Sequence, residues 1–305
     1  EIRLSLVGSE MCIRDRVNAM DFCKEKDDII YDTFASMHVR EAAVPDELIN
    51  IAAENADVAV ITLSRFSAEG VDRKPIDSDY YLSFEEKSLI NRASKAFKKT
   101  IVVLNSGAVV DCEHFADNDK VQGILFGWQG GLEGGAAVAD ILCGDVCPSG
   151  KLADTIPVSY YSYQNAEEFL TGFEHLDYYD DIYVGYRYFE TVPGAAERVR
   201  YPFGFGLSYT DFELSGVLCG ETDGKIVVSV NVKNIGSVPG KETVQLYYSA
   251  PKGVLGKPAK ELAAFAKTHL LNPGESETLA LSFDIADMAS FDDLGKVKKA
   301  AYVLE

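Results

Sequence analysis

The periodicity of the apolar residues changes once along this chain of 305 residues, near Phe212, and this change constrains the fold more than any other feature. Before Phe212, continuous apolar runs of strand length, such as 57–63 and 100–104, alternate with stretches of helical periodicity. Such runs are typical of parallel strands that are covered on both faces. After Phe212, apolar and polar residues alternate with period two, as in the short strands of a β-sandwich. We therefore predict an α/β sandwich with a mostly parallel sheet, followed by an all-β sandwich.

Three helices of the first part carry start or stop signals. Pro45 lies in the first turn of an amphipathic helix, and Ser83 with Glu86 forms a capping box ahead of the next helix. Residues 134–142 form a helix of small residues that Gly144 ends. Successive strand–helix–strand units imply right-handed crossovers and a mostly parallel sheet. Ligands of such sheets bind in the loops at the carboxyl ends of the strands.

Aromatic residues, glycine and proline interrupt the periodicity over residues 165–211. We predict that this segment is an ordered linker whose aromatic side chains pack against both neighbours. Residues 212–305 then form the second sandwich, of the immunoglobulin-like class, with turn signals at 234–236 and 272–274. Its clearest period-two strands are Lys225–Asn234, Thr243–Ser249 and Glu277–Asp284. The chain stops within what we expect to be the last strands, so we expect this sandwich to be truncated.

Composition argues against several classes of partner. The formal charge of −19 would repel phosphate backbones, so we expect no nucleic-acid partner. No stretch approaches eighteen consecutive apolar residues, so we expect no membrane span. The six cysteines are scattered, and three residues separate Cys143 from Cys147 where a redox or zinc pair has two. Reduced thiols and a cytoplasmic location are therefore expected.

The familiar cofactor and metal patterns are also missing. The four histidines lie far apart and share no metal-binding spacing. The segment Gly144–Leu152 is not a phosphate loop, because it has one residue too many and no Ser or Thr after Lys151. No Gly-x-Ser-x-Gly elbow of a serine hydrolase occurs. We expect neither a metal nor a cofactor.

The first sixteen residues need a separate explanation. Within 1–16, the run SLVGSEMCIRDR is similar to a translated sequencing adapter, which makes this segment an artefact or a non-native start. A natural first strand over 2–7 is the alternative. We assign these residues no function.

The loop after Leu63 is the candidate for chemistry. It runs from Ser64 to Arg73 and is longer and more charged than a simple connection requires. Glu69 lies in its middle, next to Gly70. A lone Glu in such a loop is ordinarily an exposed carboxylate, so its role depends on the motif around it.

That motif, Ser67–Arg73 (SAEGVDR), resembles the EG-x-DR loop of family 3 glycoside hydrolases. Four further blocks resemble the family in the same order along the chain. They are Trp128–Gly135 (WQGGLEGG), Gly144–Leu152 (GDVCPSGKL), Tyr201–Thr210 (YPFGFGLSYT), and Lys257–Leu262 together with Leu271–Glu275. Each block alone is weak evidence, whereas the five in order indicate the C-terminal part of a family 3 glycoside hydrolase similar to β-glucosidases.

The resemblance implies three domains in the full-length protein. They are a (β/α)8 barrel that carries a nucleophilic Asp, an α/β sandwich that carries the general acid/base, and a fibronectin type III-like domain. In this chain it implies the α/β sandwich at 17–164, the linker at 165–211 and the fibronectin type III-like domain at 212–305. No barrel sequence is present, and some relatives carry the domains in permuted order, so the position of the barrel stays open.

The same resemblance implies that Glu69 is the acid/base residue. Retaining hydrolysis needs one protonated carboxyl group at the leaving oxygen and a second carboxylate about 5 Å away that attacks the sugar. We expect Asp72 and Arg73 to hold the loop, by pairing with each other or with loop backbone; direct contact with the sugar is the alternative. Trp128 either packs at the end of its strand or stacks on a sugar ring.

We therefore expect a fragment of a retaining β-glycosidase, similar to β-glucosidases, that acts on terminal non-reducing β-linked sugars. β-Xylosidase activity is the nearest rival within this class. The expected partners are a β-linked oligosaccharide or glycoside and the missing barrel, without which the chain should be almost inactive. The alternative from another class is a non-catalytic accessory module that binds carbohydrate or a partner protein.

Overall fold

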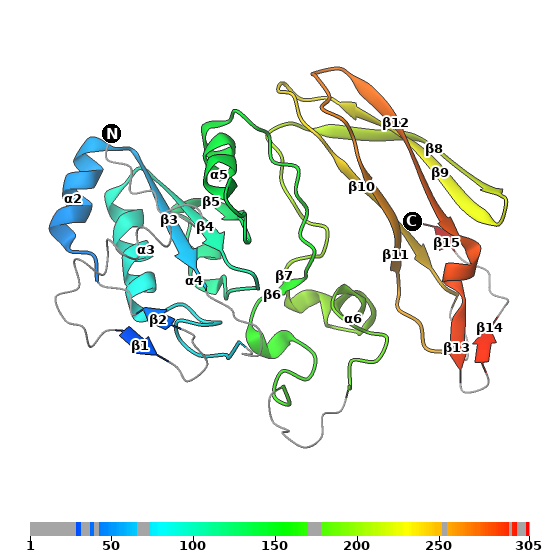
Figure 1. Ribbon diagram of the computed structural model, residues 1–305, viewed down its shortest axis with the longest axis horizontal. Coiled ribbons are helices and arrows are strands. Elements are labelled where there is room, and N and C mark those ends of the chain that lie inside the picture. The colour runs from blue at the N-terminus through cyan, green and yellow to red at the C-terminus, as the bar shows by residue number, and fades with distance from the viewer. Residues whose placement is uncertain are drawn as a thin grey trace. The chain divides into compact units, whose positions relative to one another are not determined.

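The computed structural model describes only part of the chain, and two of the predicted site residues fall outside that part. Glu69 and Asp72 lie outside the described residues, as does the segment 1–16. The chain folds into two compact units, Glu1–Cys143 and Gly144–Glu305 (Figure 1). The described residues are 29–31, 37–39, 43–65, 73–169, 178–251, 255–292, 295–297 and 303–304.

A three-stranded parallel sheet forms the centre of the first unit. Its strands are β3 (Val58–Ser64), β4 (Lys99–Asn105) and β5 (Val121–Phe126), in the order β3-β4-β5. Both pairings are parallel, which confirms the predicted sheet. β4 lies between its two neighbours and is the most buried of the three, because its neighbours cover its edges and helices cover its faces.

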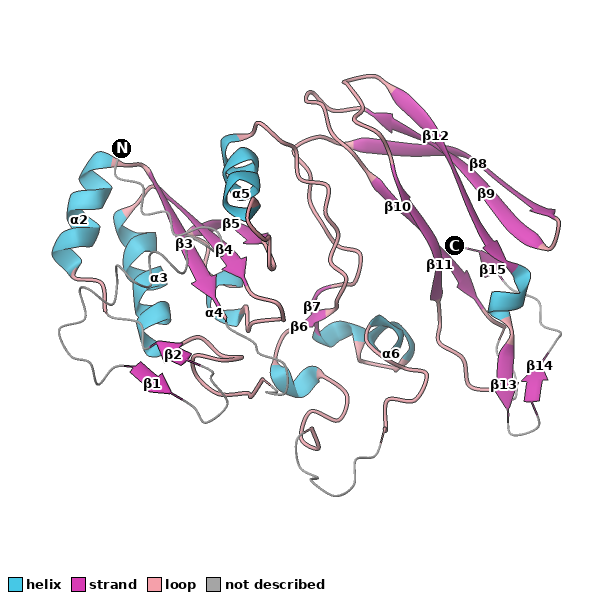
Figure 2. Ribbon diagram, viewed as in Figure 1, coloured by secondary structure: helices cyan, strands magenta, loops and turns pink. Residues whose placement is uncertain are grey.

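Helices cover both faces of this sheet (Figure 2). α3 packs against β3 and β4, and α2 packs against α3. On the other face, Val138 of α5 packs on Val103 of β4 with the partly buried Val60, Ile101 and Leu125 around them. The helices are α2 (Asp46–Asn55), α3 (Phe84–Ala96), α4 (Glu113–Ala116) and α5 (Gly134–Cys143). The strands β1 (Ile29–Tyr31) and β2 (Met37–Val39) pair antiparallel.

Two of the three predicted helix signals take their expected places, and Pro45 lies one residue before the first turn in which it was expected. The Ser83 side chain accepts a hydrogen bond from the Glu86 backbone N–H, and the Glu86 carboxylate accepts one from the Ser83 backbone N–H, which completes the capping box of α3. Pro45 is the N-cap residue of α2. Gly144 follows the last residue of α5 with a left-handed φ of 82°, a conformation that glycine adopts without strain.

The segment that follows belongs to the second compact unit and contains a short helix that the sequence pattern did not predict. α6 (Tyr186–Thr191) lies in the aromatic stretch that we described as a linker without periodicity. The Tyr186 ring stacks on Phe203 at 4.6 Å between centroids, and its hydroxyl accepts a hydrogen bond from the Leu262 backbone N–H at 2.7 Å. Two short strands, β6 (Ile156–Pro157) and β7 (Val199–Tyr201), pair antiparallel beside it.

Two antiparallel sheets complete the second unit as a β-sandwich, which confirms the predicted second fold. One sheet has the order β11-β10-β15 and the other β12-β9-β8. Apolar residues from β9, β10 and β12 form one buried core between the sheets, with Val232 and Leu271 fully enclosed. The strands are β8 (Phe212–Thr222), β9 (Lys225–Asn234), β10 (Thr243–Ser249), β11 (Glu261–Lys267), β12 (Ser276–Asp284), β13 (Ser290–Asp292), β14 (Gly295–Val297) and β15 (Val303–Leu304).

Two of the sequence blocks join the preceding segment to this sandwich. The Lys151 ammonium pairs with Glu242 at 2.9 Å and donates to the Gly206 carbonyl at 3.0 Å. The Leu152 N–H donates to Phe205 O at 2.8 Å, so the 144–152 and 201–210 blocks run alongside each other. Their role within this unit is therefore structural.

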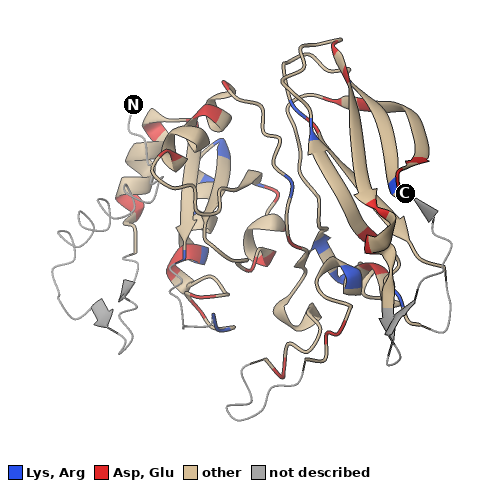
Figure 3. Cartoon of the chain, turned by 45° about the vertical axis from the view of Figure 1, so that its right-hand side comes forward, with Lys and Arg blue, Asp and Glu red and all other residues tan. Residues whose placement is uncertain are grey.

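Acidic side chains occur on the helices of the first unit and on the strands of the second alike (Figure 3). Asp and Glu outnumber Lys and Arg by 25 to 15 in residues 1–143 and by 23 to 14 in residues 144–305, so both units carry negative charge. In the described part of the chain, no helix combines the length and the apolar character needed to cross a bilayer. The domain boundaries expected at 164/165 and 211/212 stay predictions.

Candidate functional site

The three parallel strands end at one edge of the sheet, and their following loops begin side by side. Ser64 of β3 lies opposite Asn105 of β4, and Leu104 of β4 lies opposite Phe126 of β5. The Arg65 N–H donates to Asn105 O at 3.2 Å, so the ladder continues into the first loop residue. This edge is where α/β sheets bind ligands.

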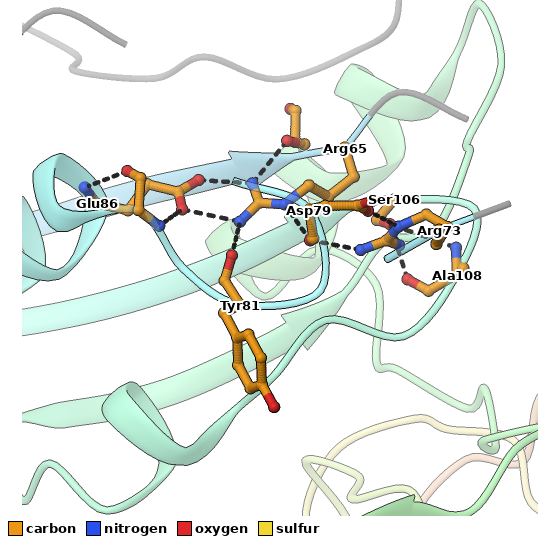
Figure 4. A network of polar contacts seen from close by, with 9 residues as sticks. Arg65, Arg73, Asp79, Tyr81, Glu86, Ser106 and Ala108 are labelled. Carbon is orange, nitrogen blue, oxygen red and sulfur yellow. Dashed lines mark hydrogen bonds and ion pairs between the residues drawn. The ribbon is translucent and has the colours of Figure 1, made fainter. Parts of the chain in front are cut away.

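Arg65 and Arg73 are the described residues on either side of the stretch 66–72. Both guanidinium groups donate to the same acceptor, the Asp79 backbone carbonyl, from Arg65 Nε at 2.7 Å and from Arg73 Nη2 at 2.5 Å (Figure 4). The entrance and the exit of the 66–72 stretch are therefore fixed on one backbone atom. Residues 65 and 73, which flank this stretch in the sequence, are thus held together at the carboxyl end of β3.

Arg65 also forms a buried ion pair with Glu86, the capping-box residue of α3. Two parallel hydrogen bonds of 2.6 and 2.8 Å join the guanidinium to the carboxylate, and the two side chains are 5% and 2% exposed. The remaining donors of Arg65 reach Ser64 O at 2.9 Å and Tyr81 O at 3.3 Å. Because every charge here has partners, the pair fixes the direction of the chain as it leaves β3.

Arg73 ties the other end of the loop to two elements. Its guanidinium pairs with the Asp79 carboxylate, whose second oxygen accepts the Lys74 backbone N–H at 2.7 Å. It also donates to Ser106 Oγ at 3.4 Å, and this hydroxyl donates to Ala108 O at 2.7 Å. Arg73 therefore connects the loop to the residues that directly follow β4.

The loop after β5 approaches the same edge. Trp128 has a left-handed backbone with φ 50°, which is a strained conformation for a residue other than glycine. Its ring lies 5.8 Å from the Phe126 ring, so it packs at the strand end, one of the two roles expected for it. A side chain at Gly130 would meet the Gly134 backbone at 2.7 Å, so this turn requires glycine.

The structure therefore brings together one predicted site residue, Arg73, with three residues that the sequence analysis did not name as site residues. Arg65 and Asp79 were not singled out, and Glu86 was recognised only as a helix cap. No pattern in the sequence marks a contact between residues 65 and 86, but charged residues that flank a long loop at a strand end are a usable signal. Among the described residues, no three His, Cys, Asp or Glu side chains are placed to hold a metal ion.

Comparison with known families assigns most of the chain. Residues 13–209 match the glycosyl hydrolase family 3 C-terminal domain, and residues 242–304 match the fibronectin type III-like domain. The chain belongs to glycoside hydrolase family 3. The resemblance that rested on five short blocks is thus confirmed. The first match contains the parallel sheet with its helices, and the second contains the sandwich strands from β10 to β15.

Relatives of this family 3 chain include several β-glucosidases. It is 47% identical to β-glucosidase A of Butyrivibrio fibrisolvens, over 88% of this chain and 37% of that protein. It superposes on a β-glucosidase of Paenibacillus barengoltzii with a TM-score of 0.82 at 37% identity, over 93% of this chain and 31% of the other. For β-glucosidase 3B of Thermotoga neapolitana, solved with glucose, the TM-score is 0.81 at 39% identity, over 93% and 40%. The chain spans about a third of the length of these relatives.

Proposed function

We propose that this chain is the acid/base-bearing part of a retaining β-glycosidase, similar to β-glucosidases, and that Glu69 is the proton donor. The observation that carries the proposal is a shared anchor: Arg65 and Arg73, the residues on either side of the stretch that contains Glu69, both donate to the Asp79 carbonyl at the ligand-binding edge of the sheet. The β-glucosidase relatives support the substrate class.

The chemistry follows from the requirements of retention. Glu69, when protonated, donates to the glycosidic oxygen as the bond to the anomeric carbon breaks. A second carboxylate, about 5 Å away, forms the covalent intermediate, and the Glu69 carboxylate then activates the water that hydrolyses it. We assign this second carboxylate to the remaining part of the full-length protein, so the chain alone should turn over almost no substrate.

The network around the loop would position this proton donor rather than react. Precise placement matters because a misplacement of about 1 Å can lower a rate by about a hundredfold. Arg65 and Arg73 are fully engaged with Asp79, Glu86 and Ser106. We assign Arg73 a positioning role together with Asp79, and we assign the same role to Asp72.

The test uses the full-length gene product with the substitution Glu69→Gln. Turnover of a natural β-glucoside should fall at least a hundredfold, because its leaving group needs the proton. An activated aryl β-glucoside should lose much less in the first step, since its leaving group departs without protonation, and added azide should restore turnover by replacing the activated water.

Glu54→Gln is the matched control, because Glu54 is an exposed residue near the end of α2. Both substrates should be turned over by this variant as by the wild type. Natural glucoside turnover that is unchanged in Glu69→Gln would reject the acid/base assignment. Binding of β-linked sugar without any turnover by the wild-type full-length product would instead support the non-catalytic module.

A further inference from the structure

A cleft of about 340 Å³ lies within the second unit. Two stretches of chain form it, 160–169 and 178–180. Its volume falls in the range of small-molecule sites. The described lining residues are Tyr160, Tyr163, Gln164, Asn165, Ala166, Glu168, Phe169, Tyr178, Tyr179 and Asp180.

Half of these residues are aromatic, and they differ in how firmly they are held. Tyr163 is fixed in edge-to-face contacts with Tyr160 at 6.4 Å and with Phe189 of α6 at 6.3 Å, so it forms a packed inner wall. Tyr178 and Tyr179, in contrast, are 86% and 54% exposed. Aromatic faces that remain in contact with water at the rim of a cleft are suited to stack on a ring with an apolar face.

Two amide side chains in the lining have hydrogen-bonding capacity that the described part of the chain does not use. Gln164 Oε1 and Asn165 Nδ2 are buried and have no partner there. Gln164 Nε2 donates to Tyr179 O at 2.9 Å, which ties the two stretches together. One acceptor and one donor on adjacent residues match a hydroxyl group, which both donates and accepts. A ligand that forms hydrogen bonds with these two atoms would remove the free-energy cost of leaving buried polar atoms without partners.

The backbone at Asn165 points to the same use. Its φ is 55°, a left-handed value, and its carbonyl accepts the backbone N–H groups of Glu168 at 3.0 Å and Phe169 at 3.2 Å. This turn places the Asn165 amide beside the aromatic residues. Strained positions of this kind concentrate at ligand sites.

We propose that this cleft binds a neutral oligosaccharide through residues of its own, none of which belongs to the Glu69 loop. The carboxylate of Asp180 would repel an anionic ligand. A purely apolar ligand would leave both amides without partners. A pyranose offers an apolar ring face to the tyrosines and hydroxyl groups to the amides. The choice of a β-linked glucan as probe rests on the proposed function.

The experiment titrates the 305-residue chain with cellotetraose by calorimetry and observes saturation transfer to the sugar by NMR. Tyr178→Ala should weaken binding about tenfold, because it removes one stacking face. Tyr161→Ala is the matched control: Tyr161 is 63% exposed on the same stretch but does not line the cleft. This variant should bind as the wild type does. Equal binding by the two variants would overturn the proposal, as would the absence of binding by a folded wild-type chain.

A second variant tests the amide without straining the backbone. Asn165→Gly keeps the left-handed conformation, which glycine adopts freely, and removes the donor. Binding should weaken at least fivefold while the thermal midpoint stays unchanged. A tetragalacturonate, with four carboxylates, should not bind, and its binding as tightly as cellotetraose would contradict the charge argument.

A last readout separates this proposal from the proposed function. In the full-length product, Tyr178→Ala should leave turnover of an aryl β-glucoside unchanged, because that substrate is too short to need a second site. Loss of that turnover would place the cleft within the catalytic machinery and would reject a separate site. Failure of the Glu69→Gln prediction would leave the binding titration, which needs no turnover, unaffected.

Discussion

Arg73 donates hydrogen bonds in several directions, and a planar guanidinium can make them together where an ammonium cannot. Its partners are the Asp79 carboxylate, the Asp79 carbonyl and Ser106 Oγ. In the full-length product, Arg73→Lys should keep the charge but release one end of the Glu69 loop. We expect the turnover number for a natural β-glucoside to fall at least tenfold, with a smaller fall for an activated aryl glucoside.

Arg92→Lys is the control for this prediction. Arg92 bonds to Val44 O and to the Asp46 carboxylate, at the start of α2 rather than at the strand ends. It should affect both substrates equally and only slightly. If Arg73→Lys lowers the two rates by the same factor, the residue stabilises the fold without positioning the proton donor.

Glu275 gives the stability of the sandwich a pH dependence at the residue scale. Hydrogen bonds from the backbone N–H of Asn272 and from the His269 and Asn272 side chains hold the pKa of Glu275 below its ordinary value of 4.5. The folded state therefore favours the carboxylate, so its stabilising effect is present above pH 4.5 and is lost as the pH falls through the lowered pKa. Glu277, which also contacts His269, is not substituted in this test.

The measurement compares wild type and Glu275→Gln by thermal unfolding between pH 6 and pH 3. The wild type should have the higher midpoint above pH 4.5, and the difference should shrink as the pH falls below 4.5. Glu221→Gln, on the exposed strand β8, serves as the control and should show no such convergence. A difference that grows as the pH falls would contradict the direction of the pKa shift.

At the scale of elements, one residue at the start of α3 has two structural roles. Glu86 completes the capping box and neutralises the buried Arg65 guanidinium. Glu86→Gln should destabilise the first unit by about 3–5 kcal/mol, because it leaves an uncompensated buried charge. Ser83→Ala removes the cap alone and should cost about 1 kcal/mol. Chemical denaturation followed by circular dichroism compares them, and equal costs would mean that the ion pair adds nothing beyond the cap.

Strands in which apolar and polar residues clearly alternate could be predicted from the sequence. Strands without this alternation could not. β9 and β10 have the predicted bounds. β8 was missed because its register shifts between Ser215 and Leu218, where Gly216 has a left-handed φ of 61° and alternation fails. β11 (ELAAFAK) is rich in alanine and lacks the β-branched residues that mark strands. Its partner β10 and the Tyr186 hydroxyl determine its conformation.

The site was predictable only in part, for a related reason. Its place followed from the rule for parallel sheets, and Arg73 followed from the family motif. The Arg65–Glu86 pair spans 21 positions of the chain, and only the finished sheet and helix bring its members together. A contact between residues so far apart produces no periodic pattern in the sequence around either residue. The charged residues at the ends of the long loop were therefore the one available signal.

At the scale of the whole molecule, the two compact units have separate hydrophobic cores. Each unit also contains a residue whose substitution should destabilise that unit alone. A side chain at Gly206 would overlap the Gly150 carbonyl oxygen in the second unit. Gly206→Ala should therefore destabilise that unit by about 1–3 kcal/mol, because backbone must move to make room. Gly220→Ala is the control, since a side chain at Gly220 of β8 meets nothing within 4 Å and should be neutral or slightly stabilising.

Calorimetry of the variants tests whether these units unfold separately. A chain with two cores is not expected to unfold in a single cooperative step, so the wild type should show two transitions. Glu86→Gln should lower one midpoint and Gly206→Ala the other, because the two changes lie in different units. Their double variant should show both shifts added, as distant independent sites do. A single transition that both variants lower would show instead that the two cores unfold as one, and the stability of each would then depend on the other.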